Sequence, residues 1–295
     1  MPPSTKAADK RTKRSTRLRM RYTGEVYRMA LDGVRKLGNG DRLIPAPTSV
    51  AQQELEALVL LGLRDARRAR NVQLPFYPFD HIIPKLDSLE LLPVPHMLGP
   101  LAFALAPRPY DDPTSGFGGI PGLRVSPGDS GMVVSLLDQN GPVPGARVLL
   151  RKVTPKQWSS ALAWADDQYG SPSTSLVHDS SLSQAEGNFL RHYGLVRVRP
   201  ALASLMLRRL HVLSDAQWID VWTADGSYKI EWADGPALAQ VALQLIEPQA
   251  GLLGTDAVLR DHDRIRAGHE PYALDFRHGG DGGGLFLRRL QQDSL

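Results

Sequence analysis

The sequence predicts an α+β protein in which antiparallel β-hairpins and a meander pack with several helices, preceded by a disordered basic arm. Short runs rich in Val and Leu, separated by Gly-containing turns, indicate strands within residues 122–153. Stretches with apolar residues at helical spacing separate this region from a second strand-rich region, which favours α+β over a doubly wound sheet. The first 21 residues are polar and basic, which is typical of a disordered terminus.

The chain divides into four predicted segments. Residues 1–21 are the disordered basic arm, and residues 22–96 form a helical segment with a Pro-rich connection. Residues 97–250 form the α+β domain, and residues 251–295 are a charged and Gly-rich C-terminal tail that we expect to be loosely packed. A chain of 295 residues is long enough to bury a sizeable core without crosslinks.

Helix-start signals place several helices. Ser49 precedes Gln52, and Ser183 precedes Glu186, at the spacing with which a cap residue and its partner begin a helix. Thr154-Pro155 places Pro at a first helical position. The prolines of residues 74–100 argue against long regular structure, so we expect an irregular connection there.

A hairpin and a catalytic-looking tetrapeptide stand out among the strands. Residues 217–235 carry alternating aromatic residues and turn at Asp225-Gly226. Gly-Asp-Ser-Gly at residues 128–131 resembles the nucleophile segment of chymotrypsin-like serine proteases, but the resemblance covers only these four residues. No upstream His has the spacing or surrounding sequence that this family needs for its general base. We therefore interpret Ser130 as a turn residue between two strands.

Positive charge is concentrated at one end of the chain. Residues 1–36 hold four Lys and seven Arg against three acidic residues, whereas the whole chain has a net charge of only +4. Such an arm is attracted to polyanions, so we expect a non-catalytic protein that contacts the phosphates of DNA or RNA. The expected contacts are Lys10, Arg11, Lys13, Arg14, Arg17, Arg19 and Arg21, assisted by Arg28 and Arg35.

Two alternatives stay open. The same arm could bind an acidic protein partner, as part of an interaction or scaffold module. Asp261, His262 and Asp263 could hold a divalent metal in a hydrolase, but adjacent side chains point in different directions, and a solvated charged loop or helix end explains these residues better. No cofactor is expected, because the glycines at 279–284 lack the residues of a phosphate-binding loop.

The sequence also bears on compartment. It contains no cysteine, which excludes disulfides, thiolate zinc sites and thiol catalysis, and which favours the reducing cytoplasm. No apolar run is long enough to cross a bilayer, so no membrane association is expected.

Overall fold

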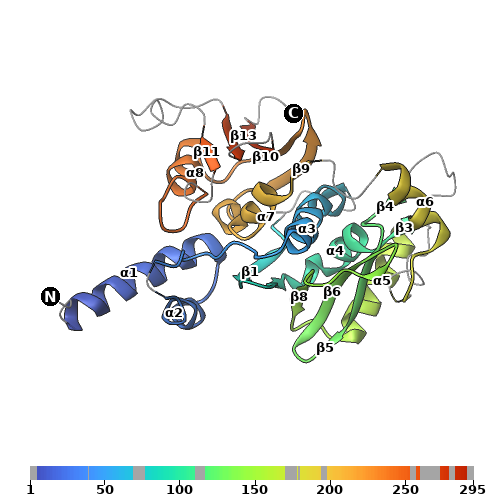
Figure 1. Cartoon of the computed structure of the whole chain (residues 1–295), viewed down its shortest axis with the longest axis horizontal. Helices are drawn as coiled ribbons and strands as arrows, with labels where there is room; N and C mark the ends of the chain where they lie inside the picture. The colour runs from blue at the N-terminus through green and yellow to red at the C-terminus, as the bar shows by residue number, and fades with distance from the viewer. Residues whose placement is uncertain are drawn as a thin grey trace.

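The computed structural model describes residues 5–38, 40–68, 77–109, 117–169, 178, 180–193, 198–252, 257–259, 273–278 and 283–290. Within them the chain forms helices and two mixed sheets, which confirms the predicted α+β class. Figure 1 shows the two sheets on different sides of helices α3 (Val50–Arg68) and α7 (Ala201–Leu207), with α1 (Thr5–Thr23) projecting from one end.

The first sheet combines hairpins with one parallel pair. Its strands lie in the order β1-β2-β8-β6-β5, with β7 beside β6, and β2 runs parallel to β8. These strands are β1 (Phe79–Pro84), β2 (Leu89–Pro93), β5 (Leu123–Gly128), β6 (Gly131–Asp138), β7 (Gly141–Pro142) and β8 (Val148–Arg151). A separate short pair joins β3 (Arg108–Pro109) to β4 (Phe117–Gly118). Gly128 pairs with Gly131 across the β5–β6 hairpin, so Ser130 is a turn residue as interpreted.

The second sheet contains the expected aromatic hairpin. β9 (Trp218–Ala224) and β10 (Ser227–Ala233) pair antiparallel and are joined at Asp225 and Gly226, whose φ angles are 52° and 69°. Two successive positive φ angles define the tight turn that fits the natural twist of a hairpin. The order of the sheet is β11-β12-β13-β10-β9, and β13 lies parallel to β10.

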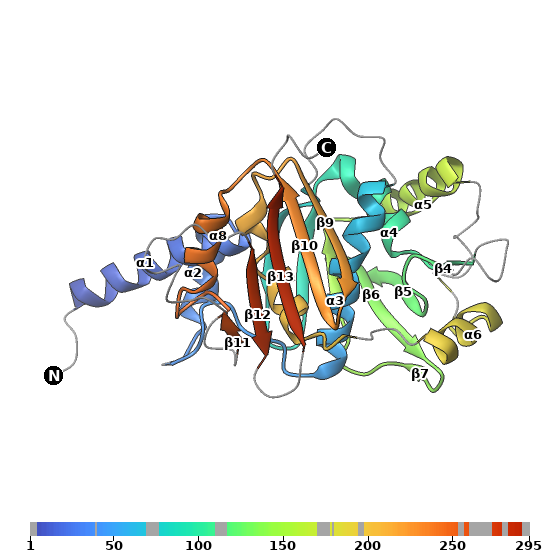
Figure 2. The ribbon, with the colours of Figure 1, turned by 90° about the horizontal axis from the view of Figure 1, so that it is seen from above.

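The prediction that the C-terminal tail is loosely packed is wrong for part of its length. The tail supplies three strands of the second sheet, β11 (Ala257–Leu259), β12 (Leu274–His278) and β13 (Gly284–Leu290). Figure 2 shows β12 and β13 lying alongside β10. The side chains of Leu274, Phe276, Leu285 and Leu287 are fully buried. Their two-residue alternation is a strand signal, but it spans only a few residues beside Gly-rich sequence. β12 and β13 pair locally and antiparallel, and β13 joins them to the rest of the sheet through a long-range parallel pairing with β10.

The Pro-rich connection also contains regular structure that the sequence did not predict. β1 and β2 form a buried antiparallel hairpin within it. Pro84 and Pro93 stand at the ends of these strands, where a missing backbone donor costs little, and Pro95 begins the short helix η1 (Pro95–Met97). Proline therefore marks where these elements end rather than excluding them.

Several helices begin where their caps predict. The Gln52 amide donates to Ser49 Oγ, and Ser183 and Glu186 each donate a backbone amide to the other's side chain. Thr154 likewise caps α5 by accepting from the Gln157 amide. The remaining helices are α2 (Tyr27–Arg35), α4 (Leu98–Leu105), α5 (Pro155–Tyr169), α6 (Gln184–Tyr193), η3 (Leu210–Leu213) and α8 (Leu238–Leu245).

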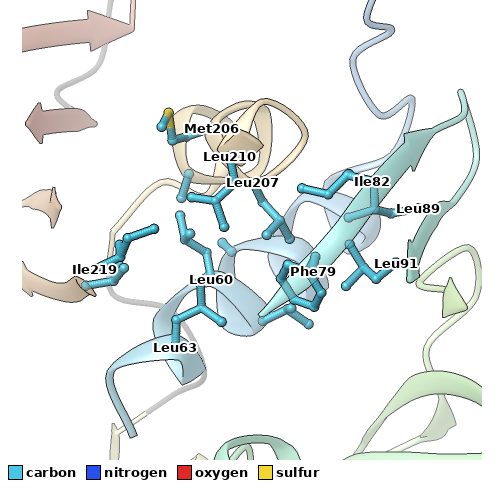
Figure 3. Packing of buried hydrophobic residues seen from close by; sticks show 14 of the residues in the cluster. Leu60, Leu63, Phe79, Ile82, Leu89, Leu91, Met206, Leu207, Leu210 and Ile219 are labelled. Carbon is cyan, nitrogen blue, oxygen red and sulfur yellow. The ribbon is translucent and has the colours of Figure 1, made fainter. Parts of the chain in front are cut away.

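Helix α3 lies at the centre of the core. It packs against α4, α7 and β9 and thereby connects the two sheets. Figure 3 shows Leu60 and Leu63 of α3 among apolar side chains from β1, β2, α7 and β9. A fully buried ion pair adds to this contact, because Arg208 donates to Glu56 Oε2 over 2.8 Å and Ser204 donates to the same oxygen over 2.6 Å. Gln52 donates to Glu56 Oε1 over 2.7 Å, so both carboxylate oxygens are satisfied.

Candidate nucleic-acid interface

Helix α1 replaces disorder over most of the predicted arm. Its inner face carries Thr16, Arg19, Tyr22 and Thr23, which are all buried. These residues recur every three or four positions, and Tyr22 donates its hydroxyl to the Gln244 carbonyl over 2.5 Å. A count of charges hides this periodicity, because the buried residues are mostly polar. The expectation of disorder is therefore wrong for residues 5–21, which are helical.

The outer face of α1 is a cationic stripe. Its members are exposed to solvent and fall within about 100° of one another around the helix, and they are Lys10, Lys13, Arg14, Arg17 and Arg21. From Lys10 to Arg21 the stripe extends about 16 Å along the helix axis. Arg11 is also exposed, but it stands about 100° around the helix from Lys10. Helical periodicity thus gathers five of the seven expected arm contacts on one side.

Most of the stripe has no counter-charge. Within the described residues, Lys10, Arg14, Arg17 and Arg21 make no ion pair, whereas Lys13 lies 2.8 Å from Asp9. The hydrogen bond that Lys13 donates to this carboxylate raises the pKa of Lys13. Both side chains are more than half exposed, so solvent screens the pair and Lys13 can exchange Asp9 for another anion.

Arg19 is not available as a phosphate contact, which corrects one predicted residue. Its side chain is only 4% exposed, and its Nε lies 2.6 Å from Glu25 Oε2. A second guanidinium nitrogen donates to the Leu43 carbonyl over 2.7 Å, and Thr23 donates to Glu25 over 2.9 Å. Arg19 thus holds the α1–α2 junction instead of facing solvent.

The two assisting arginines lie on the neighbouring helix. α2 packs against α1, and Arg28 and Arg35 are exposed there, without an ion pair among the described residues. They lie seven residues apart and so share a face of α2, with exposed Asp32 between them. Figure 1 shows α2 beside the projecting α1. These two cations extend positive charge onto a second element, and Asp32 offsets part of it.

Two shallow grooves run along α1. The first, of about 600 Å³, is lined by the stripe residues together with Asp9, Leu18 and Glu247. The second, of about 520 Å³, lies between α1 and α8, and its lining includes Leu18, Tyr22 and Leu243. The side chain of Leu243 is 58% exposed. One side of the stripe is therefore flanked by an apolar surface and a single carboxylate, Glu247.

Four of the described arginines outside the arm are buried and serve the fold, which the sequence did not reveal: Arg108, Arg124, Arg208 and Arg209. Arg124 and Glu186 pair over 2.9 Å in a buried site. Burial alone would raise the pKa of Glu186, but hydrogen bonds from Arg124 and from the Ser183 and Gly122 amides lower it below its ordinary value. The capping position of Glu186 was the available signal, since a capping carboxylate has a second oxygen free to accept an arginine.

The candidate metal ligands cannot be placed. Asp261, His262 and Asp263 lie outside the described residues. Among the residues that are described, no group of three or more His, Cys, Asp or Glu side chains is arranged to hold a metal ion.

Comparisons with models of known protein families, with curated proteins and with solved structures found no match. None of the helices in the described ranges combines the length and apolar character that a membrane crossing requires. The fold and the site define an α+β protein with a projecting helix whose exposed face is cationic.

Proposed function

We propose that this protein binds the phosphate backbone of nucleic acid through the cationic stripe of α1. The observation that carries the proposal is the placement of Lys10, Arg14, Arg17 and Arg21 on the exposed face of a projecting helix, unpaired within the described structure. Neutralising phosphates with such side chains releases condensed counterions, which supplies most of the affinity of non-specific binding. Phosphate contacts position a protein without reading sequence, so weak sequence preference is expected.

Duplex DNA is the form that suits this geometry. The major groove of B-form DNA is about 12 Å wide and admits an α-helix, whereas the corresponding groove of duplex RNA is too deep and narrow for side chains to read. The end of α1 that begins at Thr5 projects from the body in both overall views, so the helix can approach a groove without a clash from the sheets (Figures 1 and 2). Arg28 and Arg35 would contact phosphates beside the groove.

Point substitutions test the proposal better than removal of the arm. Deleting residues 1–21 would remove Arg19 and leave Glu25 buried without its partner, so lost binding could reflect lost folding. The triple variant Arg14→Gln, Arg17→Gln, Arg21→Gln removes three exposed charges and should weaken binding to a fluorescent DNA duplex at least tenfold. Fluorescence anisotropy at fixed salt measures this change.

A matched control removes the same charge elsewhere. Arg147, Arg191 and Arg289 are exposed and lie outside α1 and α2. Substituting all three by Gln should change duplex affinity less than threefold, because only general attraction is reduced. Equal losses in the two triple variants would contradict a localised interface. Parallel titrations with duplex RNA and single strands show whether the duplex DNA form is preferred.

An acidic protein partner is the second candidate, and one observation favours it. The apolar groove of Leu18 and Leu243 adjoins the stripe, which would suit a helix with acidic and apolar faces. A stoichiometric protein that stays bound after nuclease treatment, and that Leu243→Ser releases, would support this reading. Duplex binding that is unchanged by Leu243→Ser would support the nucleic-acid proposal.

A further inference from the structure

A cavity that is separate from the α1 stripe lies on the first sheet. It is open to solvent, has a volume of about 730 Å³, and is lined by η1 and α4 on one side and by the end of β8 and the start of α5 on the other. None of its lining residues belongs to α1 or α2. Its volume falls in the range of small-molecule sites, which is about 300–1,000 Å³.

One face of α5 supplies much of the lining. Lys156, Gln157, Ser160, Ala161 and Trp164 line the cavity and recur at the spacing of one helix face. Trp158 and Leu162 of the same helix are buried, so they fix the rotation of α5. The sequence of α5 therefore places a cation, polar side chains and an aromatic ring along one side of the cavity.

The aromatic end of the cavity depends on a glycine. A Cβ atom added to Gly99 would lie 2.5 Å from Trp164 Cε3, so only glycine lets the indole lie this close to α4. Trp164 is half-buried, and Pro100 and Leu98 line the cavity with it. An indole held in place beside apolar side chains is a surface on which a planar ring can stack.

The opposite end is cationic. Lys152 and Lys156 are exposed and line the cavity, and Arg151 joins them with its Nη1 3.1 Å from Glu90. Glu90 also pairs with Lys85, so this carboxylate does not cancel the positive charge around it. Asp80 is the single carboxylate among the lining residues that the structure describes.

The backbone fixes the position of Lys152. Its φ of 59° lies in the left-handed region, which is uncommon for Lys, and its amide donates to the Ser130 carbonyl over 3.0 Å. Gly131 makes this approach possible, since a Cβ there would lie 2.0 Å from the Leu150 carbonyl oxygen. The Gly-Asp-Ser-Gly turn thus holds the loop that carries Lys152.

We propose that this cavity binds a nucleoside monophosphate, with the base stacked on Trp164 and the phosphate held by Lys152 and Lys156. The separation of the two ends carries the assignment. Lys156 and Trp164 are eight residues apart on α5, about 12 Å along the axis, so the site fits a molecule with an anionic group at one end and a planar ring at the other. Gln157, Ser160 and Asp80 supply hydrogen-bonding groups around the cavity for the sugar hydroxyls or the base.

Isothermal titration calorimetry on the full chain tests the site with AMP, GMP, CMP and UMP, with the nucleoside of each, and with inorganic phosphate. At least one nucleotide should bind, and at least tenfold more tightly than its own nucleoside or phosphate. Lys152→Gln with Lys156→Gln should weaken that nucleotide at least tenfold and leave its nucleoside unchanged. Trp164→Leu should weaken both the nucleotide and its nucleoside.

A matched double substitution on α1 is the control that distinguishes binding at this cavity from binding at the stripe. Lys10→Gln with Lys13→Gln removes the same charge and should leave nucleotide binding within twofold of the unsubstituted chain. Absence of binding by all four nucleotides would overturn the proposal, as would loss of binding only in the α1 variant. Thermal unfolding checks that each variant is folded, and the exposed lysines keep the test valid if Trp164→Leu destabilises the protein.

Discussion

Arg17 and Arg19 lie two residues apart on α1 and have opposite environments. Arg17 is exposed and makes no ion pair within the described residues, whereas Arg19 is buried and bonded to Glu25. Two residues turn an α-helix by about 200°, so neighbours of this kind face opposite sides. The difference teaches that a basic sequence contains two populations of cations, one that stabilises the fold and one that is free to bind a partner.

The buried arginines divide further by their partners. Arg208 is paired with Glu56 and also donates to backbone carbonyls. Arg209, the next residue, donates to the carbonyls of Ala250 and Leu205 over 2.6 and 2.8 Å and has no carboxylate partner in the described structure. Burial and the nearby charges of Arg42 and Arg208 lower the pKa of Arg209 to about 9. Each class should respond differently to substitution.

The largest loss of stability is expected where a buried arginine is paired with a carboxylate. Glu56→Gln would leave the fully buried Arg208 without its counter-charge and should lower the free energy of unfolding by about 4–5 kcal/mol. Urea unfolding followed by circular dichroism measures it. Glu54→Gln, two residues along the same helix, should change stability by less than about 1 kcal/mol. Similar effects at the two positions would contradict the role given to the pair.

The next effect separates the two arginines of α1. Arg19→Gln should cost about 3 kcal/mol, because Glu25 stays buried without its partner. Arg17→Gln should change stability by no more than about 0.5 kcal/mol, as is usual for an exposed position, and should weaken duplex binding instead. Urea unfolding measures the stability of both variants, and duplex titration measures their affinity for DNA. Equal effects of the two substitutions would contradict the different roles given to Arg17 and Arg19.

A smaller loss is expected where no carboxylate is left behind. Arg209→Met removes a desolvated charge and leaves carbonyl acceptors unpaired, so the net cost should be about 1–3 kcal/mol, below that of Glu56→Gln. Urea unfolding of the Arg209→Met and Glu56→Gln variants compares their losses of stability. A cost equal to that of Glu56→Gln would show that the carbonyl contacts matter as much as the ion pair.

The smallest effect concerns two histidines and depends on pH. Burial is the main cause that lowers the pKa of both His81 and His211 below 6.5. The unfolded chain therefore binds more protons than the folded one as pH falls through 6.5, so the histidines' contribution to stability is present above that pH and is lost below it. Unfolding free energies measured from pH 7 to 5 should fall less steeply for His211→Gln than for the unsubstituted chain. Identical slopes would remove His211 as a cause.

The sequence was sufficient wherever the signal was local. Turns and caps such as Asp225-Gly226 and Ser183 with Glu186 are where they were predicted. Long-range pairing was not predictable, because β13 joins β10 across more than 50 residues and β1 with β2 are hidden among prolines. At the candidate site, the residue types were predictable from charge, but the burial of Arg19 depends on Glu25 and the Leu43 carbonyl, which no local pattern indicates.

Domain boundaries, compartment and sequence preference stay predictions. The boundaries proposed from composition are not tested by the structure, although parts of the arm, connection and tail are now helix or strand. One physical reason explains the arm, the connection and the tail: composition reports how polar a segment is, whereas packing depends on which face of the segment is polar.

The salt dependence of duplex binding tests the central claim most directly. The logarithm of the association constant should fall linearly with the logarithm of salt concentration, with a slope of about −0.9 for each phosphate neutralised. The Arg14→Gln, Arg17→Gln, Arg21→Gln variant should show a slope smaller in magnitude by about 2–3 than that of the unsubstituted chain and of the Arg147, Arg191 and Arg289 control. An unchanged slope in the α1 variant, or no duplex binding by the unsubstituted chain at low salt, would contradict the proposal that the α1 stripe binds the phosphates of duplex DNA.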